Sequence, residues 1–344
     1  MATECESFAL GLLRFRPILV EKIWGGRRLE AAFGRALPEG RSIGESWEVS
    51  GLREALTPVA EGPFKGADVY RLAEARGEEV FGPGLAGPCR EDFPLLVKFI
   101  DASAVLSVQV HPGDEYARGE GFPNGKSETW VVAAADEGAC VFRGFNDGVG
   151  PEEFREALDS GEVARVERCL RRVEVKAGDV IDLPARTVHA IGAGCLLCEI
   201  QQSSDLTYRV YDWGRAGLDG KPRPLHLDKA WDVMDFAGDD AGPDIAHPVA
   251  GDDARAGGGA ELAVYRDSYP FHLETAKVSG RARVESPGDR FEIVSVLSGR
   301  GEVAGPDGRR TRLAAGDSAM VPASWDGYEV ICEEPMKWVR AWVV

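Results

Sequence analysis

The sequence contains four side chains of types that can bind one metal ion together. Gln109 and His111 lie two positions apart in an apolar alternating run, so as a strand they point to the same face. Glu128 follows after a polar, glycine-containing turn, and His189 comes much later. An amide oxygen, two neutral imidazoles and a carboxylate form a mixed site that suits Zn²⁺ and would also accept Mn²⁺, Co²⁺ or Fe²⁺. The competing interpretation is that Gln109 and His111 pair with each other or with a backbone group inside a barrel.

Strands must position these side chains, and the sequence predicts mostly strands. Alternating or continuous apolar runs predict strands at 43–50, 93–100, 104–111, 129–135, 139–145, 172–176, 179–183, 189–191, 196–202 and 208–213. Helical spacing and N-terminal signals predict helices at 27–33, 67–75, 151–158, 162–170 and 226–237. Residues 1–13 form a short arm in which 5–13 is a candidate edge strand. The pattern is typical of a mainly β protein with a small helical insertion.

A short internal repeat indicates two related β-barrels. Ala177-Gly-Asp-Val-Ile-Asp-Leu-Pro-Ala185 recurs, offset by 138 positions, as Ala315-Gly-Asp-Ser-Ala-Met-Val-Pro-Ala323. Upstream, the strand that starts at Glu128 parallels one that starts at Phe291, and this offset of 163 leaves 25 extra residues in the first copy. Glu128 thereby aligns with Phe291, and His189 aligns with Gly327. The second copy is therefore predicted to lack the metal ligands.

The same observations predict the domain organisation. Residues 1–237 are expected to form a metal-binding catalytic domain with a helical insertion around 146–171. Residues 238–260, rich in Gly, Asp and Ala without periodicity, are expected to be a linker or long loop. Residues 261–344 are expected to form a degenerate barrel without metal ligands.

Composition limits the classes of partner. The chain has 344 residues and a formal net charge of −17. This negative charge disfavours binding to nucleic acid or to an anionic membrane. We expect a cytoplasmic protein, because the sequence shows no signal peptide and no apolar run of membrane-spanning length. The 7 cysteines are scattered through apolar contexts and predict reduced thiols. Cys195 and Cys198 would face opposite sides of a strand, which favours core packing over a shared metal.

Several motifs together resemble one enzyme family. The stretches are 21–26 (EKIWGG), 44–51 (GESWEVSG), 106–112 (LSVQVHP), 125–130 (GKSETW) and 199–212 (EIQQSSDLTYRVYD). In this order they resemble type I mannose-6-phosphate isomerases of the short bacterial form, within the cupin superfamily. The resemblance implies two cupin, jelly-roll-like barrels. Arg186 stands where many cupins have a glycine, which makes the loop before His189 harder to predict.

The resemblance also implies a reaction and roles for further residues. The enzyme would interconvert mannose 6-phosphate and fructose 6-phosphate by proton transfer between C1 and C2 through an enediol. The family singles out Lys126 for substrate binding or proton transfer and Arg209 for charge stabilisation and substrate binding. Ser107 lies on the Gln109 side of its strand by alternation, and its hydroxyl is a candidate hydrogen-bond donor to the phosphate. Asp205 is a candidate acid or base in ring opening. Alternatively, Lys126 and Arg209 are surface charges and Asp205 forms a salt bridge with Arg209 or caps a turn.

Two other functions fit the sequence less well. A metal bicupin oxygenase would need a site richer in histidine, but the chain has 5 histidines, of which His226, His247 and His272 lie outside the motifs. A non-enzymatic sugar-binding bicupin would show degenerate ligands in both copies, whereas only the second copy is degenerate. The expected partner is thus a small phosphosugar, with the protein acting as a monomer or homodimer.

Overall fold

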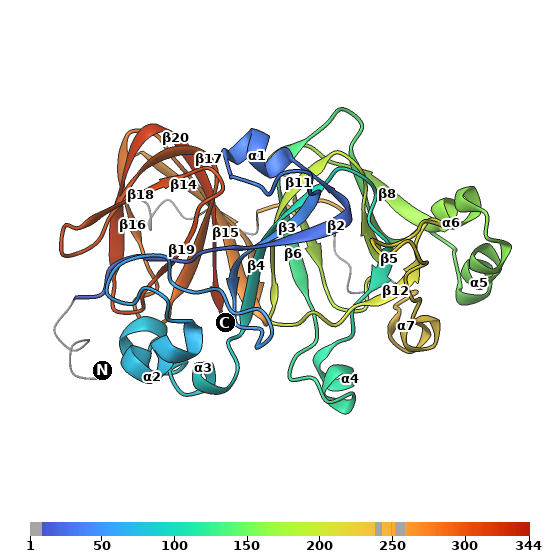
Figure 1. Ribbon diagram of the computed structural model, residues 1–344, viewed down its shortest axis with the longest axis horizontal. Helices are drawn as coiled ribbons and strands as arrows, with labels where there is room; N and C mark the ends of the chain where they lie inside the picture. The colour runs from blue at the N-terminus through green and yellow to red at the C-terminus, as the bar shows by residue number, and fades with distance from the viewer. Residues whose placement is uncertain (1–8, 238–242, 249, 252–258) are drawn as a thin grey trace.

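The computed structural model describes residues 9–237, 243–248, 250–251 and 259–344, and it is mainly β (Figure 1). The six-stranded sheet has the order β2 (Ile18–Gly26), β3 (Ile43–Ser50), β4 (Leu95–Ala102), β11 (Cys195–Gln202), β6 (Glu128–Ala135) and β9 (Val180–Leu183). The five-stranded sheet has the order β12 (Tyr208–Tyr211), β5 (Val108–Val110), β10 (His189–Ile191), β7 (Cys140–Phe145) and β8 (Leu170–Glu174).

The remaining strands form a nine-stranded sheet, mostly from the C-terminal part of the chain. Its order is β1 (Leu13–Arg14), β19 (Ser318–Val321), β17 (Glu292–Ala304), β20 (Gly327–Val343), β15 (Phe271–Val278), β14 (Ala260–Ser268) and β13 (Ala250–Gly251). In addition β16 (Arg281–Glu285) pairs with β20, and β18 (Arg310–Ala314) pairs with β17. The N-terminal strand β1 therefore belongs to the C-terminal sheet and pairs there with β19.

Helices lie at the ends and edges of the sheets (Figure 1). They are α1 (Arg28–Phe33), α2 (Val69–Phe81), α3 (Pro88–Glu91), α4 (Asp114–Gly119), α5 (Pro151–Ser160), α6 (Val163–Cys169) and α7 (Leu227–Val233). Along the chain, helices α5 and α6 follow β7 and precede β8, within the segment 146–171. Within the described ranges, none of the helices combines the length and apolar character needed to cross a bilayer.

Successive side chains of the central strand β4 pack alternately into two apolar clusters, one on each face. On β4, Val97 and Phe99 pack into a cluster that also takes Phe291 and Leu273 from the nine-stranded sheet. On the other face of β4, Ile100 packs with residues from both smaller sheets. Lys98 shares that second face by period-2 alternation, so it points into the space between the two smaller sheets rather than into the core.

The sequence-based element predictions differ from the structure at a few places. Strand β5 has only 3 residues, and α3 and α4 were not predicted. Residues 5–8 of the candidate edge strand 5–13 lie outside the described ranges, and of the rest only Leu13 belongs to a strand, β1 at the edge of the nine-stranded sheet. Much of the expected linker 238–260 also lies outside the described ranges. Cys195 and Cys198 pack into two different apolar clusters, as their spacing predicted. The closure of the sheets into two cupin barrels and the domain boundaries stay predictions.

Candidate active site

Three of the four predicted metal ligands form one buried cluster. His111, Glu128 and His189 bring ligand atoms within 4.8 Å of one another. Glu128 Oε2 lies 3.5 Å from His111 Nε2, and Glu128 Oε1 lies 3.3 Å from His189 Nε2. The ligands come from two sheets: His189 begins β10, His111 follows β5 directly, and Glu128 begins β6. The carboxylate therefore meets both imidazoles only because the two smaller sheets face each other.

Gln109 completes the set from the neighbouring strand. It is paired in register with His189 across the β5–β10 ladder, so the two side chains leave the same face. Gln109 Nε2 lies 3.2 Å from His189 Nε2. Rotation of the terminal amide exchanges its nitrogen and oxygen without moving other atoms, and this would direct the oxygen to the same point. The structure thus brings together all four donors.

Backbone carbonyls hold both imidazoles in the orientation that a metal ligand needs. His111 Nδ1 lies 3.0 Å from the Leu206 carbonyl oxygen, and His189 Nδ1 lies 2.9 Å from that of Thr187. A carbonyl oxygen can only accept a hydrogen bond, so each ring carries its proton on Nδ1 and presents the Nε2 lone pair to Glu128. Burial and the nearby Lys126 ammonium hold the pKa of His111 well below its ordinary value. Burial lowers the pKa of His189 to about 4, so both rings are neutral at pH 7.

Arg186 explains how the loop before His189 reaches the site. Its φ is 77°, the left-handed region that favours glycine. Two hydrogen bonds hold this conformation: the Arg186 N–H donates to the His111 carbonyl over 2.7 Å, and its Nε donates to the Val233 carbonyl over 3.2 Å. An arginine can therefore take the place of glycine here, because contacts with the β5 segment and α7 compensate for the unfavourable backbone angle.

The donor set fits a divalent metal. Glu128 is fully buried, and neither of its oxygens makes a well-aligned hydrogen bond in the described part of the chain. The Lys126 ammonium is close, 3.0 Å from Glu128 Oε2 and 3.1 Å from His111 Nε2, but its angles to the carboxylate are poor. A buried carboxylate without hydrogen bonds is costly, and coordination by a cation is the ordinary way to satisfy it. Gln109, His111, Glu128 and His189 would hold that cation.

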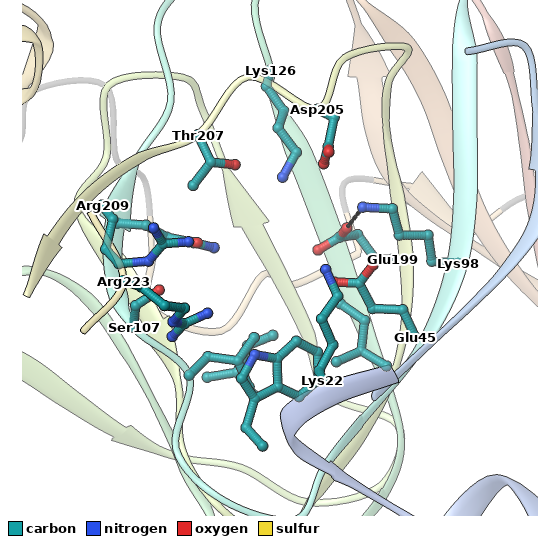
Figure 2. Close-up of a pocket in the computed structure, with 15 residues that line it drawn as sticks. Lys22, Glu45, Lys98, Ser107, Lys126, Glu199, Asp205, Thr207, Arg209 and Arg223 are labelled. Carbon is teal, nitrogen blue, oxygen red and sulfur yellow. Dashed lines mark ion pairs between the residues drawn. The ribbon is translucent and has the colours of Figure 1, made fainter. Parts of the chain in front are cut away.

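A polar cavity of about 230 Å³ opens beside this cluster (Figure 2). Among the predicted site residues, Ser107, Gln109, Lys126, Asp205 and Arg209 line it. Strand pairing places Arg209 directly opposite Gln109, on the strand next to it. The structure therefore brings the predicted metal-ligating and substrate-binding residues to one place.

One wall of the cavity carries a row of paired charges that the sequence analysis missed. Lys98 and Glu199 face each other across the β4–β11 ladder with 3.4 Å between Nζ and Oε1. Lys22 on β2 forms a second ion pair, 3.0 Å from Glu45 on β3. All four line the cavity, together with Trp24. A signal was present, since Lys98 and Glu199 interrupt otherwise apolar strands and a charge there must point into a polar space.

Burial and the neighbouring ammonium groups shift the pKa of Glu45 in opposite directions. Burial alone would raise the pKa of Glu45, but the ammonium groups of Lys98 and Lys22 outweigh it and lower this pKa to about 2. Glu48, from the same motif, faces the opposite side of β3 and forms an ion pair with Arg35. Trp24 lines the cavity, whereas Glu48, on the far side of β3, stabilises the packing behind it.

Arginines occupy the other wall. Arg209 is half-buried, and burial together with the nearby Arg223 lowers the pKa of its guanidinium. Its Nη1 donates to the Pro224 carbonyl over 2.9 Å. Arg223 also lines the cavity and was missed, because it lies in a Gly- and Pro-containing loop without strand or helix periodicity. Asp205 is exposed at the cavity and forms no ion pair with Arg209 within the described ranges.

Comparisons with known proteins agree with this geometry. Residues 12–143 match the family model for the catalytic domain of type I phosphomannose isomerase. The probable mannose-6-phosphate isomerase GmuF of Bacillus subtilis (strain 168) is 36% identical over 319 residues, which cover 92% of this chain and 95% of the relative. The mannose-6-phosphate isomerase of Streptococcus mutans is 36% identical over 82% of this chain and 84% of its own.

Solved structures show the same fold. A mannose 6-phosphate isomerase from Bacillus subtilis superposes with a TM-score of 0.85 at 30% identity and covers 97% of this chain and 100% of its own. A mannose 6-phosphate isomerase bound with zinc and yttrium has a TM-score of 0.73 at 16% identity, with 97% of this chain and 100% of that chain covered. The sequence motifs, the donor cluster and these relatives agree, and the chain belongs to the family of type I mannose-6-phosphate isomerases.

Proposed function

We propose that this protein interconverts mannose 6-phosphate and fructose 6-phosphate, with Zn²⁺ held by Gln109, His111, Glu128 and His189. The observation that carries the proposal is the buried Glu128 carboxylate, which faces two Nε2 lone pairs at the edge of a cation-lined cavity. The family supplies the reaction, and the donor chemistry supports the metal. Zinc in such a site polarises a bound oxygen and stabilises the negative charge of an enediolate.

The reaction must move a proton between C1 and C2, and Lys126 is placed to assist. Its side chain is only 5% exposed and its ammonium lies beside His111 and Glu128, so it would reach a sugar oxygen placed next to these residues. We assign Lys126 to substrate binding and proton transfer. A buried ammonium that is already directed at the reacting oxygens requires little reorganisation as charge develops there.

Arg209, Ser107 and Asp205 take the remaining roles that we propose. Arg209 is fixed opposite Gln109 and stabilises charge on the substrate oxygens next to the metal. Ser107 lines the same wall and contributes a hydroxyl donor for the phosphate. Asp205, exposed at the cavity and without an ion-pair partner among the described residues, is available to move a proton in the opening of the sugar ring.

We assign the chemistry to residues 1–237 and a supporting role to 261–344. The five- and six-stranded sheets supply every proposed ligand, and both consist of residues between 18 and 211. The nine-stranded sheet packs against them through an apolar cluster that includes Phe81 and Phe291, whose rings lie 5.4 Å apart.

A coupled isomerase assay tests the proposal. The protein as purified should convert mannose 6-phosphate, lose activity in a chelator and regain it with added zinc. His189→Ala should lose both bound zinc and turnover while it keeps the circular dichroism of the wild type. If zinc-loaded wild-type protein shows no turnover, the proposed reaction is wrong.

A further inference from the structure

The cavity has two walls with different charge balance. On one wall each cation has its own carboxylate, Lys22 with Glu45 and Lys98 with Glu199. On the other wall Arg209 and Arg223 line the cavity, and the nearest carboxylate is Asp212, which forms ion pairs with Arg223 and with Arg215 behind the wall. The first wall is neutral, whereas the second carries an excess of positive charge in a partly buried place.

Arg223 is held so that part of its guanidinium is available to donate hydrogen bonds to a ligand in the cavity. Asp212 binds one edge of the group, accepting from Arg223 Nε over 2.7 Å and from Nη2 over 2.5 Å. Nη1 makes no hydrogen bond within the described part of the chain, although the residue lines the cavity and its side chain is only 20% exposed. A guanidinium has five N–H donors in a fixed plane, so binding one edge to a carboxylate leaves further donors for a second anion.

The loop that carries Arg223 is fixed to the site by Arg209. Arg209 N–H donates to His226 Nδ1 over 3.0 Å, and the His226 N–H donates to the Arg209 carbonyl over 2.8 Å. With the bond from Arg209 Nη1 to the Pro224 carbonyl, three contacts hold the loop against β12. Arg223 is thus a positioned group and not a free surface charge.

We propose that Arg223 binds the 6-phosphate of the sugar and that Asp212 positions its guanidinium for this. The inference rests on the proposed function, because it takes the phosphosugar as ligand. A phosphate carries between one and two negative charges at pH 7 and belongs on the wall with excess positive charge. Figure 2 shows Arg223 beside Ser107 on the side of Arg209, across the cavity from the Lys98–Glu199 pair.

The chemistry of the substrate supports this arrangement. The phosphate is on C6, several bonds away from the C1 and C2 atoms that react. With C1 and C2 at the metal ligands and Lys126, the phosphate needs a cation in another part of the cavity. Arg223 supplies one that neither touches the metal ligands nor is neutralised by a carboxylate of its own, since Asp212 also binds Arg215.

The central test compares Arg223→Gln with Lys221→Gln, a matched loss of charge at an exposed position of the same loop. In Arg223→Gln, the KM for mannose 6-phosphate and the Kd for inorganic phosphate measured by calorimetry should both rise roughly ten- to hundredfold. Bound zinc and kcat should change far less. Lys221→Gln should match the wild type. An unchanged KM and phosphate Kd in Arg223→Gln would overturn the proposal.

A second comparison tests the positioning role of Asp212. Asp212→Asn should raise KM and the phosphate Kd without loss of zinc, and it should add little in the Arg223→Gln background. Equal and additive effects of the two substitutions would contradict it. Arg223→Lys keeps the charge but loses the planar fork and should recover only part of the affinity.

The phosphate titration separates this inference from the proposed function. If wild-type protein binds phosphate through Arg223 but converts no mannose 6-phosphate, the proposed function fails and the anion site stands. If the wild type is an active isomerase and Arg223→Gln behaves like Lys221→Gln, only the inference fails.

Discussion

Two buried glutamates occupy matching places in the strand ladders and have opposite surroundings. Glu128 pairs in register with Leu183, and Glu292 pairs with Val321, the residue that matches Leu183 in the repeated motif. Glu128 meets two imidazole lone pairs beside a polar cavity lined by Gln109 and Lys126. Glu292 meets Arg340, whose Nη2 donates to its carboxylate over 2.6 Å. A similar framework thus holds a candidate metal centre in one sheet and an internal ion pair in the other.

This comparison also corrects the sequence alignment. The repeat aligned Glu128 with Phe291, whereas the ladders place Glu292 there, one residue further on. Phe291 instead packs in the apolar cluster between the sheets. A slip of one residue moves a side chain to the other face of a strand, so the error changed a buried carboxylate into a core aromatic. The C-terminal sheet keeps the carboxylate and neutralises it with an arginine.

Arg340 is the centre of that ion cluster. It is fully buried and also forms an ion pair with Glu274, and its Nη2 donates to the Glu285 carbonyl over 2.6 Å. Next to it the rings of His272 and Trp342 stack with centroids 3.9 Å apart. In this sheet the buried Glu292 carboxylate is thus neutralised by an arginine, whereas Glu128 faces the lone pairs of two imidazoles.

The largest effect is expected from Glu128→Gln. The neutral amide removes the anionic ligand, so bound zinc should be lost and kcat should fall by at least about a thousandfold. Metal analysis and the coupled assay measure both. Glu292→Gln is the matched control and should keep full zinc content and kcat. A Glu128→Gln protein that retains zinc would show that the two glutamates differ less than their surroundings indicate.

Arg340→Met should cause the largest loss of stability. It leaves the carboxylates of Glu274 and Glu292 buried without their cation, which typically costs about 3–5 kcal/mol in the free energy of unfolding. Urea unfolding followed by tryptophan fluorescence measures it. Adding Glu274→Gln and Glu292→Gln should recover part of the loss. A single substitution that leaves the unfolding midpoint unchanged would mean that the cluster does not stabilise the sheet.

Glu45→Gln should alter how stability depends on pH. The pKa of Glu45 is lowered to about 2 in the folded protein, so the unfolded chain binds more protons between its ordinary pKa and that value. The contribution of Glu45 is present above an ordinary glutamate pKa and is lost as pH falls through about 2, and it amounts to about 3 kcal/mol. The stability gap between wild type and variant should therefore close on acidification. A gap that stays constant with pH would exclude this coupling.

The smallest expected effect is that of ionic strength on the KM for mannose 6-phosphate. Positive charge is concentrated on one wall of the cavity although the whole chain carries −17. Raising the ionic strength from about 0.05 to about 0.5 M should increase the KM for mannose 6-phosphate by a few fold through screening. The dependence should weaken in Arg223→Gln. A flat series in the wild type would remove the electrostatic part of the argument.

The sequence predicted the central strands and the shared face of Gln109 and His111 because both depend on local patterns, whereas the meeting of Glu128 with the two histidines depends on how the two smaller sheets pack. Alternation places Gln109 and His111 on one face whatever the rest of the chain does. Lys98, Glu199 and Arg223 were missed because their role depends on which strand or loop lies opposite, and this is fixed by long-range pairing. The conformation of Arg186 was likewise unpredictable, since tertiary hydrogen bonds hold an angle that its own side chain disfavours.

The pairing of β1 with β19 has a consequence for biosynthesis. Leu13 lies opposite Met320, so the first strand to leave the ribosome has its partner among the last. At synthesis rates of about 5–20 residues per second, β1 stays without its partner for roughly 15–60 seconds. The two sheets around the candidate metal centre end at Tyr211 and can assemble during that interval. Docking of β1 then follows the synthesis of β19 and can come after the assembly of these two sheets.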